Sequence, residues 1–299
     1  MTLKKQIPNI LTLLNLLSGT IAIIFAVNNE LEIAAYLVFL GIFFDFFDGF
    51  AARLLNVQGE LGKQLDSLAD VVTSGVVPGI VMYQLILKSV HENWINGLSC
   101  EIGNWVSFEE SHWHWLPFFG LLITLAAAYR LAKFNIDERQ TSSFIGLPTP
   151  ASALVVLSLP LILEYSSIDL VIAIIHNKWF LIALTLLLSY LMNAEIPLFS
   201  LKFKDYSWEN NKIKYIFILL TLGLIISFQF VAIPLVILLY IFLSIILSCF
   251  YLETNSLTHT NKCSNKNDYG KLVTYKNHTK YDTCWVNNYL HGYRGALQS

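Results

Sequence analysis

One apolar run constrains this chain more than any other feature, because it is long enough to cross a bilayer and still contains two aspartates. The run covers residues 31–55, and a helix needs about 20 apolar residues to span the hydrocarbon core. A carboxylate at that depth costs roughly 2.5–3.5 kcal/mol on insertion scales unless something compensates it. Asp45 and Asp48 stand three residues apart, so a helix places them on one face. We therefore expect a partner for this pair elsewhere in the fold.

A second pair of aspartates follows after a polar turn at residues 56–60. Asp66 and Asp70 share a spacing of four residues with Gly62, so the three form one stripe on a second helix. Two helices joined by a short loop pack against each other, and the two carboxylate pairs can then converge across their seam. Hard divalent cations take oxygen ligands, and a pair of them can clamp a diphosphate and its attacking group. The predicted metal ligands are Asp45, Asp48, Asp66 and Asp70.

The composition indicates a polytopic membrane protein. Hydrophobic residues make up 55% of the 299 residues and charged residues 13%. Apolar segments of span length cover residues 10–27, 31–55, 62–88, 115–134, 148–165, 178–195, 212–229 and 232–250. A tight turn near Pro234 separates the last two, and one long kinked element is the alternative there. The predicted fold is an all-α membrane bundle of about eight transmembrane helices.

Positive charge indicates how this bundle is oriented. Lysines and arginines cluster before the first span and after the second, fourth, sixth and eighth, whereas the opposite loops contain only Lys88 and Lys178. The positive-inside rule then places both termini and the aspartates on the cytoplasmic side.

The composition changes abruptly after residue 250. Residues 251–299 are rich in Asn, Lys, Thr and Tyr and show little apolar periodicity, which is typical of a poorly ordered extension. We therefore expect a membrane-embedded domain over residues 1–250 and a polar cytosolic tail over 251–299. The four cysteines share no close spacing, so we expect neither a zinc site nor a disulfide framework.

The aspartates belong to a longer pattern, D-x2-D-G-x2-A-R-x8-G-x3-D-x3-D. All eight fixed positions are filled, by Asp45, Asp48, Gly49, Ala52, Arg53, Gly62, Asp66 and Asp70. This pattern resembles the signature of the CDP-alcohol phosphatidyltransferases, integral membrane enzymes that make phospholipids from CDP-linked donors. Softer similarities at residues 7–19, 65–72, 129–135 and 144–151 resemble the CDP-diacylglycerol–serine branch of that family, which occurs in bacteria and archaea. The resemblance covers about residues 1–250 and does not extend to the tail.

The resemblance implies a reaction and roles for several residues. The phosphatidyl group of CDP-diacylglycerol would pass to L-serine with release of CMP, and the aspartates would hold two divalent cations, Mg²⁺ or Mn²⁺. Asp70 would be the base that takes the proton of the serine hydroxyl. Gly49, Arg53 and Gly62 match the positions that hold the cytidine and the diphosphate, and small residues also let a nucleotide lie close to the helix backbone. The resemblance further implies a prokaryotic cytoplasmic membrane, is compatible with a homodimer, and suggests no nucleic-acid partner.

Two more residues are candidate substrate contacts, each with an alternative role. Arg130 stands near the cytoplasmic end of the fourth span, where its guanidinium could clamp a phosphate or a carboxylate. The alternative is a positive-inside anchor. Asn9 could contact the donor, or it could cap the first span.

Two other functions stay open at this point. The acceptor could be glycerol 3-phosphate or an inositol phosphate, although an anionic acceptor calls for a larger basic pocket than Arg53, Arg130 and Arg139 provide. The chain could instead be an ion-coupled transporter that uses the aspartates as a cation site. Paired interrupted helices in an internal repeat would favour transport, but the motif occurs once.

Overall fold

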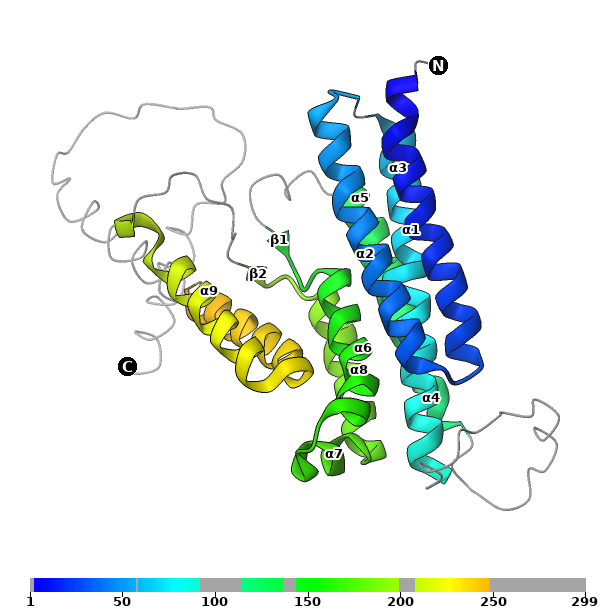
Figure 1. Cartoon of the computed structure of the whole chain (residues 1–299), viewed down its shortest axis with the longest axis vertical. Coiled ribbons are helices and arrows are strands. Elements are labelled where there is room, and N and C mark those ends of the chain that lie inside the picture. The colour runs from blue at the N-terminus through cyan, green and yellow to red at the C-terminus, as the bar shows by residue number, and fades with distance from the viewer. Residues whose placement is uncertain (1–2, 58, 92–114, 137–143, 199–207, 248–299) are drawn as a thin grey trace, which may run out of the picture. The chain divides into compact units, whose positions relative to one another are not determined.

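The computed structural model describes residues 3–57, 59–91, 115–136, 144–198 and 208–247, and these are almost entirely helical (Figure 1). The helices are α1 Leu3–Val27, α2 Leu31–Leu54, α3 Glu60–Asp70, α4 Val77–His91, α5 Leu122–Ile136, α6 Thr149–Tyr165, α7 Asp169–Ile175, α8 Lys178–Asn193 and α9 Trp208–Phe228. Residues 232–247 form a further helix. The predicted all-α class is confirmed apart from one antiparallel pair of two-residue strands, β1 Phe144–Ile145 and β2 Pro197–Leu198. The predicted tail lies outside the described residues.

Helix length and composition support five to six membrane spans in the described part of the chain. The five are Gln6–Val27, Leu31–Leu54, Glu60–Val90, Leu116–Ile136 and Asn211–Leu247. The helices α7 and α8, bent by 74° at their junction, would together make a sixth. The predicted span at residues 148–165 corresponds to α6, which has 17 residues and falls just short of the usual length. The count of eight and the orientation of the termini remain predictions.

The last apolar segment reverses direction within its length. Phe217 and Tyr240 place their ring centroids 6.0 Å apart, whereas a straight helix would separate these residues by about 35 Å at 1.5 Å per residue. The reversal lies at the 3₁₀ turn Gln229–Val231, where Gln229 adopts a φ of 48°. The predicted turn near Pro234 is thus displaced by a few residues. Pro234 instead stands in the first turn of the following helix, where a missing N–H is tolerated.

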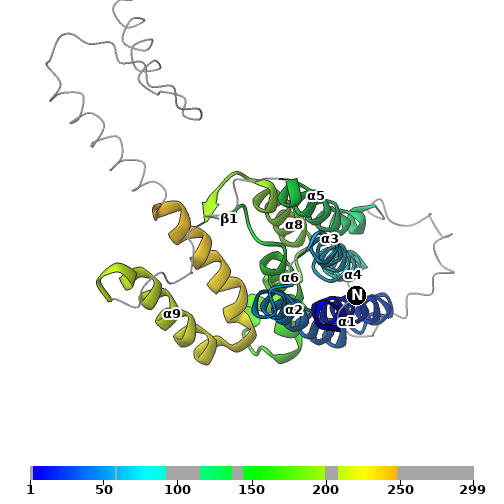
Figure 2. The ribbon, with the colours of Figure 1, turned by 90° about the horizontal axis from the view of Figure 1, so that it is seen from above.

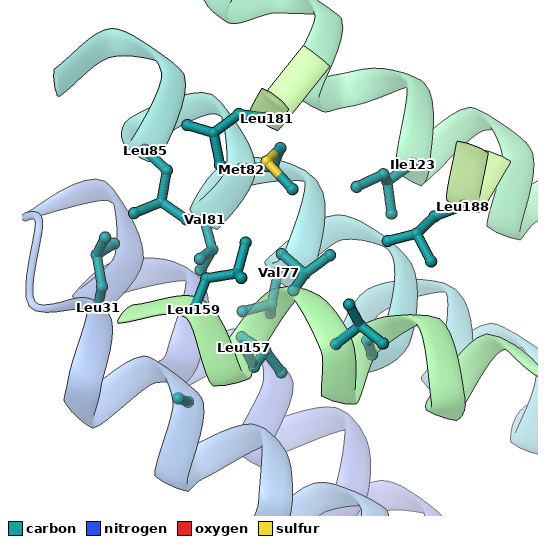
Figure 3. Close-up of a cluster of buried hydrophobic side chains, with 14 of the residues drawn as sticks. Leu31, Val77, Val81, Met82, Leu85, Ile123, Leu157, Leu159, Leu181 and Leu188 are labelled. Carbon is teal, nitrogen blue, oxygen red and sulfur yellow. The ribbon is translucent and has the colours of Figure 1, made fainter. Parts of the chain in front are cut away.

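The core forms around α4, which contacts α1, α2, α5, α6 and α8. Its buried side chains Val77, Val81, Met82 and Leu85 meet leucines from α6 and α8 and Ile123 of α5 (Figure 3). Seen from above, α3 and α4 lie between the α1–α2 pair and α5 (Figure 2). This arrangement surrounds the aspartates of α3 with helices on both sides.

The chain between α3 and α4 does not break but widens into a π-helical segment, Val71–Val76. Such segments are rare and frequently occur at functional sites. Thr73 in this segment lies where α1 and α2 both present a glycine. A Cβ added at Gly19 would lie 2.5 Å from Thr73 Oγ1, and one at Gly41 would lie 2.7 Å from Thr73 Cγ2. The two glycines therefore allow the close approach of α1 and α2 to the π-helical segment that follows α3.

Candidate active site

The first two aspartates occupy the final turns of α2. Asp45 is half-buried, and Asp48, one turn later, is 5% exposed. The chain then reverses through a short connection in which Asn56 adopts a φ of 52°, a left-handed conformation that asparagine tolerates better than most residues. Gly59 precedes α3 in an extended conformation. The predicted polar turn at residues 56–60 therefore joins α2 to α3, with residue 58 outside the described residues.

Three of the four predicted ligands form one cluster. Ligand oxygens of Asp45, Asp48 and Asp66 all lie within 4.8 Å of one another. Three carboxylates at this spacing repel one another unless positive charge is placed between them. The cluster offers only oxygen ligands, which suits Mg²⁺ or Mn²⁺. Asp66 Oδ1 is also buried and has no hydrogen-bond partner among the described residues, so it is an acceptor that a cation would satisfy. The residues present thus fit a divalent metal.

Asp70 lies close to this cluster but outside the group of three. It is the last residue of α3, one turn beyond Asp66, and it interacts electrostatically with Asp66 and Asp48. Its Oδ1 accepts a hydrogen bond of 3.5 Å from the Asn15 side-chain amide on α1. Its environment therefore differs from that of the three clustered aspartates.

The helix α1 supplies two polar contacts to the carboxylates, and neither was among the contacts predicted from the sequence. Thr12 Oγ1 donates a hydrogen bond of 2.5 Å to Asp48 Oδ2. Thr12 and Asn15 are both buried, at 3% and 0% exposure, on the same face of α1. Their spacing of three residues on a strongly apolar helix is the signal that could have identified Thr12.

Arg130 is buried at 8% exposure on α5, with an electrostatic interaction with Asp70. Its Nε has no hydrogen-bond partner among the described residues. A positive-inside anchor would be expected to reach the membrane surface, so this burial favours a binding role over an anchoring one. An unpaired buried guanidinium nitrogen is available for an anionic group.

The remaining predicted contacts lie at the ends of α1, α2 and α3. Asn9 stands six residues inside α1, so the alternative that it caps this helix is wrong. Its Oδ1 would lie 3.5 Å from a Cβ added at Gly62 of α3. Arg53 is exposed and donates from Nε to the Gly49 carbonyl oxygen at 2.9 Å. Its guanidinium is thus folded back along α2.

Hydrogen bonds also tie α3 to the end of α5. Lys63 Nζ donates to the Asn135 carbonyl oxygen at 3.0 Å, and Asn135 Nδ2 donates to Ser67 Oγ at 2.8 Å. Lys133, which follows Arg130 by one turn, forms an ion pair of 3.3 Å with Glu195 beyond the end of α8. The two hydrogen bonds hold the end of α5 that carries Arg130 beside the helix that carries Asp66 and Asp70, and the ion pair ties the same end of α5 to the chain after α8.

The sequence that contains these aspartates is similar to that of known proteins. A family model described as CDP-alcohol phosphatidyltransferase matches residues 5–191, which include every aspartate of the cluster. The chain belongs to the CDP-alcohol phosphatidyltransferase family. It is therefore a transferase of phospholipid biosynthesis, and its long apolar helices indicate an integral membrane protein.

Several relatives of this CDP-alcohol phosphatidyltransferase have names that include serine. The CDP-diacylglycerol–serine O-phosphatidyltransferase of Bacillus subtilis (strain 168) is 31% identical over 210 residues, covering 69% of this chain and 96% of that protein. The archaetidylserine synthase of Methanothermobacter thermautotrophicus is 31% identical over 166 residues, covering 54% and 61%. A CDP-diacylglycerol–serine O-phosphatidyltransferase of Helicobacter pylori (strain J99) is 32% identical over 151 residues, covering 50% and 54%.

Proposed function

We propose that this transferase moves the phosphatidyl group of CDP-diacylglycerol to L-serine, giving phosphatidylserine and CMP. The observation that carries the proposal is the similarity to the Bacillus subtilis enzyme, which extends over 96% of that protein. The archaeal relative is also named for a serine product. The buried Arg130 near Asp70 adds support, because an amino-acid acceptor brings a carboxylate that needs such a partner.

We further infer that Asp45, Asp48 and Asp66 hold divalent cations, Mg²⁺ or Mn²⁺, with Asp70 as the fourth carboxylate. The all-oxygen cluster and the unpaired Asp66 Oδ1 support this inference. When bound, the cations would neutralise charge on the diphosphate oxygens and make CMP a better leaving group.

Asp70 is the proposed general base. A serine hydroxyl is a weak nucleophile until a base takes its proton. The hydroxyl oxygen would bond to the phosphorus that carries diacylglycerol, the bond from that phosphorus to the CMP oxygen would break, and the proton would remain on Asp70. Asn15 holds one oxygen of Asp70, which leaves the other to accept the proton.

The remaining residues of the proposed site bind and orient the substrates. Arg130 would clamp the serine carboxylate beside Asp70, so that the hydroxyl meets the base in a fixed orientation. The backbone at Gly49 and Gly62 would admit the cytidine and diphosphate, with Asn9 and Arg53 at the edge of that space. The site would face the cytoplasm of a prokaryotic cell, in a domain of residues 1–250 with a cytosolic tail. The proposed arrangement of the site is compatible with a homodimer.

An acceptor panel tests the proposal. Membranes that contain the protein are incubated with CDP-diacylglycerol, Mg²⁺ or Mn²⁺, and labelled L-serine, glycerol 3-phosphate or inositol phosphate, and the lipid product is identified. We expect label in phosphatidylserine only, and none in membranes that contain Asp45→Asn. Label from glycerol 3-phosphate or inositol phosphate instead would refute the choice of serine. The absence of any labelled lipid would refute phosphatidyl transfer and revive the transport alternative.

A further inference from the structure

The hydrogen bond between Thr12 of α1 and Asp48 of α2 is short, and both residues are buried. The hydroxyl-to-carboxylate distance is 2.5 Å, and neither residue is more than 5% exposed. Hydrogen bonds from a hydroxyl to a carboxylate in this range are charge-assisted and about twice as strong as neutral ones. The contact therefore restrains the orientation of the Asp48 carboxylate.

Thr12 does not need Asp48 to satisfy its own hydroxyl. Helical threonines can donate to the carbonyl four residues back, as Thr20 and Thr185 do at 2.8 Å. Thr12 has the same option, since its Oγ1 lies 3.1 Å from the Pro8 carbonyl oxygen. A hydroxyl has one proton to donate, and the shorter contact with the charged acceptor takes it. The hydrogen bond is therefore not required to satisfy the Thr12 hydroxyl, and its main effect is to restrain the Asp48 carboxylate.

The position of Thr12 is itself fixed by the packing of α1. A threonine side chain in a helix has two favoured χ1 rotamers, so its hydroxyl has few possible directions once the backbone is placed. The α1 backbone is held close to the π-helical segment at Gly19 and by the hydrogen bond of 3.3 Å from Thr73 Oγ1 to the Asn15 carbonyl oxygen. The helix that contributes no carboxylate to the cluster is thus rigidly placed against it.

We propose that Thr12 is a positioning residue, whose hydroxyl orients the Asp48 carboxylate for a divalent cation. This inference rests on the proposed metal site. It adds α1 to the machinery of that site, although the eight-position motif lies wholly in α2 and α3. Removal of the hydroxyl would leave Asp48 in place but free to rotate, and would weaken cation binding.

Direct metal binding tests this proposal without reference to turnover. The full-length protein in nanodiscs, without donor, is titrated with Mn²⁺, and free Mn²⁺ is followed by its electron paramagnetic resonance signal. Thr12→Val keeps the shape of the side chain and removes the donor, whereas Thr12→Ser keeps the donor. Ser18→Ala is the matched control, because Ser18 is equally buried on α1 but donates to the Leu37 carbonyl oxygen at 2.5 Å. Asp48→Asn reports the loss of the ligand itself.

We expect Thr12→Val to weaken Mn²⁺ binding by about 10- to 100-fold, the usual effect of removing a partner of a metal ligand. Thr12→Ser and Ser18→Ala should bind nearly as the parent does. If Thr12→Val bound Mn²⁺ normally while Asp48→Asn did not, or if Ser18→Ala lost as much binding as Thr12→Val, the positioning role would be wrong. Normal binding by Asp48→Asn would overturn the metal site itself, and the proposal with it. Thr12→Ala replaces Thr12→Val if the valine variant does not fold.

Discussion

The Asn15 side-chain amide on α1 donates to Asp70 Oδ1 across 3.5 Å, a contact between residues 55 positions apart in the chain. Asn15 is held tightly, because a Cβ added at Gly41 of α2 would lie 2.8 Å from its Oδ1. Its amide nitrogen, a hydrogen-bond donor, therefore points toward the Asp70 carboxylate. Asp48 also accepts a hydrogen bond from a neutral donor, Thr12, but it lies among the crowded carboxylates of Asp45 and Asp66, whereas Asp70 lies outside that group. This difference in surroundings is what we expect for a base beside a set of metal ligands.

The role of Asp70 as a base can be separated from a role as a ligand. Asp70→Asn could still offer one oxygen to a cation but could not accept the serine proton. We therefore expect near-parental affinity for CDP-diacylglycerol with metal, and a turnover lower by about 10²–10⁴-fold, the usual contribution of a positioned base. Donor affinity and single-turnover rates in the same nanodisc preparation provide the measurement.

The comparison variant for this experiment is Asp45→Asn, which should lose donor affinity and turnover together. If Asp70→Asn lost donor affinity as severely, Asp70 would be chiefly a metal ligand and the base would have to lie elsewhere. Asn15→Leu in the same assay should lower turnover more than donor affinity, because it removes the donor to Asp70 and leaves the cluster of three intact.

The clustered aspartates carry a second prediction. Asn in place of Asp45, Asp48 or Asp66 should abolish turnover while the protein remains inserted and folded. Each change removes one of the negative charges that would attract and hold the cation. Chelation of divalent metal from the parent should have the same effect, reversed by Mg²⁺ or Mn²⁺. Turnover is measured against metal concentration for each variant. Near-normal turnover of any of them at low metal would contradict the metal role.

Much of the site was predictable because helix geometry is local. Spacings of three and four residues place Asp45 with Asp48 and Asp66 with Asp70, and the short connection brings the two pairs to the same end of the bundle. The prediction that α2 and α3 pack against each other is wrong, because α3 packs against α1 rather than α2. What α1 contributes was not predictable in this way. Whether Thr12 or Asn9 meets an aspartate or a glycine depends on how α1 packs, and that depends on Gly19, Gly41 and Thr73, far apart in the sequence.

The number of spans was harder to predict for a different reason. Hydropathy identifies apolar residues but does not report where a helix bends. The segment after residue 168 breaks into α7 and α8 at 74°, and the segment from Asn211 reverses at Gln229 rather than near Pro234. Proline is compatible with a first helical turn, so its position alone did not locate the reversal.

The tail is predicted to be dispensable for catalysis. A stop after residue 252 removes a segment that is rich in polar residues and has little apolar periodicity, and every residue of the proposed site lies before Leu131. Insertion and turnover should therefore be largely unchanged. Both are measured on the truncated and full-length proteins expressed side by side. A truncated protein that inserts normally but is inactive would show that the tail takes part in the reaction.

The last prediction concerns the space at Gly49 and Gly62. A Cβ at Gly49 would meet only Arg53 Nη2, at 3.6 Å, and one at Gly62 only Asn9 Oδ1, at 3.5 Å, among the described residues outside the glycine's own helix backbone. The fold therefore has room for alanine at both positions. Alanine is also the better helix former, by about 0.5–1 kcal/mol. If the donor's nucleotide lies against this backbone, Gly49→Ala and Gly62→Ala should be at least as stable as the parent. They should nevertheless bind CDP-diacylglycerol about 10-fold more weakly, equivalent to about 1.4 kcal/mol.

Gly120→Ala is the control that separates lost space for the donor from damage to the fold. A Cβ at Gly120 would lie 2.4 Å from the backbone nitrogen of Tyr83, and backbone cannot move aside cheaply. This variant should be destabilised by about 1–3 kcal/mol, the typical effect of overpacking. Thermal unfolding and donor affinity are measured for all three variants. If Gly62→Ala keeps or gains thermal stability but binds the donor more weakly, the loss of affinity cannot come from a disturbed fold. Unchanged donor affinity at both Gly49 and Gly62 would mean that the nucleotide lies elsewhere.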